Sequence, residues 1–142
     1  MSLLPREQAA SDDRPRYHVV VRYIMQDDPR QATLTNKLIE SLSRESPGYI
    51  SFICLAEIYG VLDHSYKLTK PQIKEAVPSI LTSESLLVEN KELVGRAFYS
   101  YTFGNADFDD CLIAQCAIAV GCSSTVTFDK LAAKSAGMQL LY

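Results

Sequence analysis

Three carboxylates stand where a metal site could form. Glu57 comes after the apolar run Tyr49–Ile53, Asp110 lies at the start of an apolar segment, and Asp129 directly follows Thr125–Phe128. Side chains that follow parallel strands gather at one edge of the sheet. Glu57, predicted in the first turn of its helix, and Asp110 both have apolar surroundings, which favours burial. Carboxylates that converge in this way repel each other unless a cation such as Mg²⁺ or Mn²⁺ lies between them. Such an ion can activate water for phosphodiester hydrolysis.

Each of these carboxylates taken alone has a simpler explanation, because acidic residues in the first turn of a helix are stabilised by the helix dipole. We interpret Asp107 and Asp109 as helix caps or solvated neighbours, and Asp27 and Asp28 as a turn and a cap. Asp107 and Thr127 remain candidates for a supporting role at the site, although caps and turns explain them equally well.

The elements that must position the carboxylates alternate along the chain. Short apolar runs predict strands at residues 49–53, 86–88, 124–127 and 139–141, and 19–21 is a further β-branched run. Helical spacing predicts helices at about residues 29–44, 70–78, 93–104, 107–120 and 130–135, and one of about 14 residues beginning near Leu55. Asp28 and Thr69 are the predicted N-caps, and Pro78 is expected to kink or end its helix. The alternation predicts the α/β class, with a small parallel sheet flanked by helices on both faces.

Length and composition restrict the class of protein. The 142 residues, 47% of them hydrophobic and 22% charged, fit one globular domain at 17–142 after a loose leader at 1–16. No apolar run is long enough to span a membrane and no secretory signal is visible, so we expect a cytoplasmic protein without membrane contact. The net charge of −3 argues against a surface built to neutralise phosphates. The four cysteines are interpreted as buried thiols in a reducing compartment.

Four stretches together resemble the PIN-domain nucleases, and among these the VapC-type toxins of bacterial toxin–antitoxin pairs. They are Val21–Gln31, Ile53–Glu57, Gly104–Ala114 and Gly121–Asp129. The likeness extends over about residues 18–142 and implies a single PIN-like domain. It further implies a Mg²⁺- or Mn²⁺-dependent endoribonuclease in which Glu57, Asp110 and Asp129 are the catalytic and metal-binding carboxylates. The implied partners are an RNA substrate, a cognate antitoxin and a second copy of the chain.

The chain departs from the family pattern at one position. The family opens with a strand that ends in Asp-Thr-Asn, and the register set by Val21–Tyr23 places that first Asp at Arg16. An arginine there opposes metal binding. Codons for Asp12–His18 that are read one base out of frame permit Met-Ile-Ala-Leu-Asp-Thr, the expected start of the family. We therefore hypothesise that residues 1–18 are a frameshifted leader, which a gene without such codons would exclude.

Two other functional hypotheses remain. Loss of the first Asp could leave a catalytically impaired module that binds an antitoxin or dimerises without cleaving RNA. A structural α/β domain with no site is the third hypothesis, and it would make the spacing match accidental. The aromatic stretch Phe98–Phe103 could stack RNA bases, but a core or dimer interface is the commoner role for such a stretch.

Overall fold

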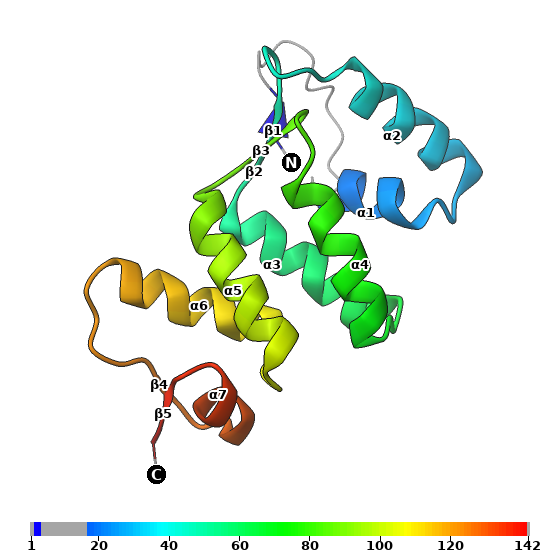
Figure 1. Cartoon of the computed structure of the whole chain (residues 1–142). Coiled ribbons are helices and arrows are strands. Elements are labelled where there is room, and N and C mark those ends of the chain that lie inside the picture. The colour runs from blue at the N-terminus through cyan, green and yellow to red at the C-terminus, as the bar shows by residue number, and fades with distance from the viewer. Residues whose placement is uncertain (1, 4–16, 142) are drawn as a thin grey trace. The chain divides into compact units, whose positions relative to one another are not determined.

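The computed structural model describes residues 2–3 and 17–141 of the chain. Two compact units divide the chain: an N-terminal unit, Met1–Glu89, and a C-terminal unit, Asn90–Tyr142. Both mix helices with short strands, and helices predominate (Figure 1). The predicted α/β class is confirmed at this level. Among the described strands, parallel pairing is limited to β2 with β3 and β4 with β5, so no larger parallel sheet is formed.

The N-terminal unit contains five helical segments and a three-stranded sheet. Its elements are β1 Ser2–Leu3, α1 Tyr17–Met25, α2 Pro29–Ser41, β2 Gly48–Ile50, α3 Phe52–Gly60, the π-helical turn η2 Val61–Ser65, α4 Lys70–Leu81 and β3 Leu86–Val88. β2 lies in the middle of the sheet, antiparallel to β1 and parallel to β3. The register with β3 aligns Gly48 with Leu86 and Ile50 with Val88.

Helix starts in the N-terminal unit follow the predicted caps. The Asp28 carboxylate accepts a hydrogen bond from the Gln31 N–H at 2.9 Å, and Pro29 occupies the first helical position. Thr69 forms a reciprocal capping box with Gln72 at the start of α4. Both predicted caps are therefore confirmed.

The N-terminal unit differs from the sequence pattern at three places. The β-branched run Val19–Val21 lies inside α1, where Val20 and Val21 are 2% and 1% exposed, so burial of one helix face outweighs the strand preference of valine. The strand predicted at 49–53 ends at Ile50, because the Ser51 hydroxyl accepts the Cys54 N–H and begins a helix. α4 also continues past Pro78 to Leu81.

The C-terminal unit contains two long helices, a short helix and a two-stranded parallel sheet. Its elements are α5 Lys91–Phe103, α6 Phe108–Ala119, β4 Val126–Thr127, α7 Lys130–Ser135 and β5 Gln139–Leu140. α5 and α6 pack against each other. Phe108 at the start of α6 contacts Phe98 and Tyr101 edge to face, with ring centroids 6.2 and 5.9 Å away. Gly121, at φ +87°, follows α6 as predicted.

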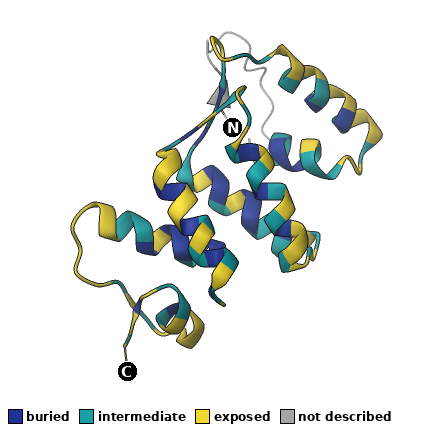
Figure 2. Cartoon of the chain, in the orientation of Figure 1, coloured by how far each residue is buried: buried dark blue, intermediate teal, exposed yellow. Residues whose placement is uncertain are grey.

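Burial follows the helical stripes. Each helix of Figure 2 carries buried residues on one side and exposed residues on another. The most buried large side chains are Phe108, Ile50, Leu55, Ile58, Leu62, Ile73 and Leu93. Cys54 and Cys111 are buried as predicted, whereas Cys122 is exposed. No helix in the described part of the chain is long and apolar enough to cross a membrane.

Candidate metal site

Three aspartates gather at the N-terminal turn of α6. Asp107 is the N-cap residue, and Asp109 and Asp110 lie in the first turn. One carboxylate oxygen from each of the three lies within 4.8 Å of the others. Hard carboxylate oxygens at this spacing form a donor set that could hold a divalent cation.

The short link between α5 and α6 fixes where these aspartates point. α5 ends at Phe103 and is followed by Gly104. A Cβ atom on Gly104 would lie 2.8 Å from the Ser100 carbonyl oxygen, so a side chain would force the backbone to shift. Ala106 and Phe108 are then buried on either side of Asp107, at 3% and 1% exposure. Burial of these neighbours turns Asp107 outward, and the next turn of the helix brings Asp110 back beside it.

Asp129 belongs to the same unit and is held by hydrogen bonds at the start of α7. Its Oδ1 accepts the N–H groups of Leu131 and Ala132 at 2.8 and 3.1 Å. The Thr127 hydroxyl oxygen in turn accepts the Asp129 N–H at 3.0 Å. Asp129 is therefore a helix cap, and Thr127 stabilises the turn that leads from β4 into that cap. The second oxygen of the Asp129 carboxylate is outside these bonds.

The electrostatics of the cluster centre on Asp110. Partial burial raises the pKa of Asp110, and the negative charges of Asp109, Asp107 and Asp129 raise it further. Asp109 Oδ1 also accepts the Asp110 N–H at 2.9 Å, which holds the two carboxylates on the same turn. A bound cation would relieve the repulsion that raises this pKa.

The structure corrects the predicted environment of Glu57. This residue is exposed and lies in the second turn of α3, because the helix already begins at Phe52. The prediction of a buried first-turn carboxylate was therefore wrong. Glu57 belongs to the N-terminal unit, and its part in a metal site stays a prediction from the family resemblance. Arg16, which takes the place of the family's first Asp, lies outside the described residues.

Sequence reasoning undervalued Asp109. The interpretation of this residue as a solvated neighbour rested on its position near a helix start, where caps are common. The structure instead brings its carboxylate to within ligand spacing of Asp107 and Asp110. The available signal was local: three of the four consecutive residues Asp107–Asp110 are aspartates.

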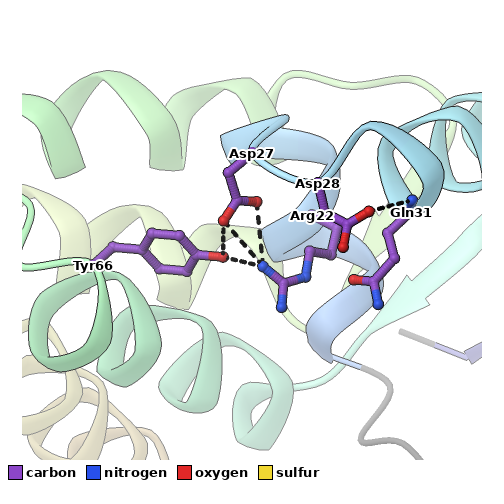
Figure 3. Close-up of polar contacts among 5 residues, drawn as sticks. All are labelled: Arg22, Asp27, Asp28, Gln31 and Tyr66. Atoms are coloured by element: carbon purple, nitrogen blue, oxygen red, sulfur yellow. Dashed lines mark hydrogen bonds and ion pairs between the residues drawn. The ribbon is translucent and has the colours of Figure 1, made fainter.

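The N-terminal unit holds a polar cluster of a different kind, formed by Arg22, Asp27 and Tyr66 (Figure 3). Arg22 Nη1 donates to both carboxylate oxygens of Asp27 at 3.2 and 3.1 Å and to the Tyr66 hydroxyl. That hydroxyl donates to Asp27 at 2.9 Å. Desolvation opposes ionisation of Asp27, but the hydrogen bonds from Tyr66 and Arg22 outweigh it and lower the pKa of Asp27. Asp27 is thus a paired structural anion.

Comparison of the chain with protein-family models, with curated proteins and with solved structures finds no match.

Proposed function

We propose that the chain is a divalent-metal-dependent endoribonuclease of the PIN type. The observation that supports this is the cluster of Asp107, Asp109 and Asp110, with Asp129 close enough to raise the pKa of Asp110. Four carboxylates in one small unit repel each other, and a site for Mg²⁺ or Mn²⁺ accounts for a chain that keeps them together.

Each residue would then have a distinct part. Asp110, whose ionisation is disfavoured in the apo fold, and Asp109 and Asp107 beside it would hold the ion. Asp129, fixed as a cap by two N–H groups, would present its second oxygen from the start of α7. A bound divalent ion supplies water activation and charge neutralisation at the phosphate. Neutralisation by an ion would also explain how a chain with a net charge of −3 handles RNA.

The same proposal includes the finer features implied by the resemblance. These are a single PIN-like domain with one sheet, a role for Glu57 in the site, a cognate antitoxin, a second copy of the chain, and action in the cytoplasm. They are supported by the order and spacing of the four stretches that resemble the family.

The alternative is a catalytically impaired module that binds a protein partner. The observation in its favour is Arg16 at the position of the family's first Asp. A positive side chain at that position would repel the cation that the other carboxylates attract.

The experiment is an RNA cleavage assay on the full chain with and without Mn²⁺. Asp110→Asn keeps the shape of the side chain but removes its charge, and Asp27→Asn is the matched control outside the cluster. We expect Mn²⁺-dependent cleavage by the native chain and by Asp27→Asn, and a loss of roughly a hundredfold or more in Asp110→Asn, since even residues that only support metal ligands cost about 10–100-fold. Cleavage that survives in Asp110→Asn, or that needs no metal, contradicts the proposal.

A further inference from the structure

The aromatic stretch at the end of α5 divides into two pairs with different surroundings. Phe98 and Tyr101 pack on Phe108 inside the C-terminal unit. Tyr99 and Phe103 are 67% and 74% exposed, and their ring centroids lie 4.7 Å apart with a tilt of 51°. The first pair forms core, as the sequence favoured, whereas the second pair presents two adjacent π-faces to solvent.

The same face of α5 carries charge. Helical spacing places Glu92, Gly95 and Arg96 on the side of the helix that Tyr99 and Phe103 occupy. Arg96 forms an exposed ion pair with Glu92 at 2.8 Å. Such a pair is weak in solvent, so a phosphate can compete with Glu92 for the guanidinium group. Glu92 is the single acidic residue on α5, because the other acidic residues of the C-terminal unit are four aspartates at the starts of α6 and α7.

Gly95 provides a second observation. It lies in the middle of α5, where glycine is the least favourable residue after proline. A Cβ atom built on Gly95 would have no atom within 4 Å, so neither packing nor backbone geometry requires a glycine there. Side chains on a helix lean toward its N-terminus, so Tyr99 leans over the turn that contains Gly95. The missing side chain leaves room beside the Tyr99 ring for a flat group to approach.

We propose that Tyr99 and Phe103, with Arg96 beside them, form a platform on which unpaired bases of single-stranded RNA stack. The inference rests on the proposed ribonuclease function and extends it to the class of substrate. Aromatic rings and guanidinium groups are the chemistry that binds unstacked bases and the phosphates between them. Bases in a duplex are already stacked on each other, so the platform favours single-stranded segments.

The size of the patch separates this occupant from a second copy of the chain. An aromatic side chain offers about 150–250 Å², so two rings at this exposure contribute on the order of 300 Å². A stable protein interface needs about 800 Å² from each partner. Along α5 the apolar surface ends at Arg96 and Glu92, one to two turns before Tyr99. The area of the two rings, with charged residues toward the start of the helix, fits one or two bases better than a protein partner.

The test measures binding without cleavage. A fluorescently labelled, unstructured RNA oligonucleotide is titrated with the full chain in EDTA, which removes divalent metal, and anisotropy gives the affinity. Tyr99→Ala and Phe103→Ala remove one ring each, and a double alanine variant removes both. Tyr99→Leu combined with Phe103→Leu keeps apolar area but removes the π-faces. The matched control is Leu34→Ala, which truncates an apolar side chain of α2 that is 58% exposed. Gly95→Leu fills the space beside Tyr99 without removing a ring.

We expect each alanine variant to weaken binding about tenfold, the double leucine variant to bind as weakly as the double alanine variant, and Gly95→Leu to weaken binding as well. Leu34→Ala and the conservative Tyr99→Phe should bind like the native chain.

Native affinity in the double alanine variant overturns the proposal, as does native affinity in the double leucine variant. A native chain that cleaves RNA with Mn²⁺ while its ring variants bind normally overturns the platform alone. A native chain that neither binds nor cleaves RNA overturns the ribonuclease function as well. If the alanine variants lose self-association in sedimentation but keep RNA affinity, the face is a protein interface and the proposal fails.

Discussion

Carboxylates in the two units of the chain have opposite electrostatic surroundings. In the N-terminal unit, Asp27 is paired with Arg22 and Tyr66, and Asp28 caps α2. In the C-terminal unit, the charges around Asp110 are other carboxylates, and they raise its pKa where the partners of Asp27 lower the pKa of that residue. A paired anion stabilises the fold, whereas clustered anions destabilise it until a cation binds. The difference therefore distinguishes the unit that carries the aspartate cluster from the N-terminal unit.

Exposed apolar side chains are also unevenly divided between the two units. Among the described residues, nine exposed large hydrophobic side chains belong to the C-terminal unit and four to the longer N-terminal unit. Scattered exposed apolar residues are normal on a protein surface, whereas a contiguous exposed patch marks a binding surface. The unit that carries the aspartate cluster therefore also exposes more of its large apolar side chains.

We expect the largest effect from loss of the Phe108 ring in the core of the C-terminal unit. Phe108 is 1% exposed and contacts both Phe98 and Tyr101, so Phe108→Ala leaves a cavity between α5 and α6 that costs about 3–5 kcal/mol. We expect hydrogen exchange to accelerate throughout residues 90–141. The same substitution removes the anchor between Asp107 and Asp109, so metal binding should be lost with it. Unchanged exchange in the C-terminal unit contradicts this account of its core.

Addition of Mg²⁺ or Mn²⁺ should act on the C-terminal unit, which carries the aspartate cluster. A ligand that binds only the folded state stabilises it by about 2.7 kcal/mol when its concentration is a hundred times its dissociation constant. We expect the ion to slow hydrogen exchange around α6 in the native chain and in Asp27→Asn, and to have no such effect in Asp110→Asn. Slower exchange confined to the N-terminal unit would move the metal site away from the α6 aspartates.

Opposite responses to pH follow from the two kinds of carboxylate. Asp27 has a lowered pKa in the fold, so its stabilisation is present above its ordinary value of 3.8 and is lost as the pH falls through the folded value. Asp110 has a raised pKa, so the fold is favoured while Asp110 is protonated and loses stability as the pH rises from 3.8 through the folded value. In EDTA at neutral pH, Asp27→Asn should therefore lower the melting temperature and Asp110→Asn should raise it.

Each of these melting-temperature shifts should be smaller than the shift that metal causes. Both should disappear in acid, where the two carboxyl groups of the native chain are protonated. Shifts of the same sign at neutral pH would show that the two carboxylates have similar environments, which contradicts the difference between the units. A lower melting temperature for Asp110→Asn in EDTA would show that its charge has a stabilising partner.

Local signals made much of the fold predictable from the sequence. Asp28 and Thr69 cap the helices they were expected to cap, and α7 has the predicted bounds, Lys130–Ser135. In each case the side chain acts on its own backbone within three residues, so the sequence contains all the information. The strand predicted at 49–53 failed because Ser51, a good N-cap, competes with the strand preference of the apolar residues around it.

The candidate site was predictable only in part. Asp110 and Asp129 were recognised because each follows an element boundary that the sequence marks clearly. The misjudged environment of Glu57 came from a helix that begins earlier than expected, and a shift of a few residues moves a side chain to another turn and another face. Burial depends on contacts between elements, which local spacing does not contain. Of the charges that raise the pKa of Asp110, those of Asp109 and Asp107 are local, whereas the charge of Asp129 comes from the start of another helix and could not be foreseen from local spacing.

The smallest effect is expected at Gly95, and it tests the uncovered face of α5 without removing any contact. Alanine there meets no atom within 4 Å and has a higher helix propensity, so Gly95→Ala should stabilise the C-terminal unit by about 0.5–1 kcal/mol. Urea denaturation measures the gain in the free energy of unfolding, and hydrogen exchange measures it locally in α5. A gain of this size would show that the helix tolerates a side chain at this position and that the space beside Tyr99 is open. Destabilisation by alanine would instead show that Gly95 is needed for packing, and it would remove the space beside Tyr99 as an argument for a ligand.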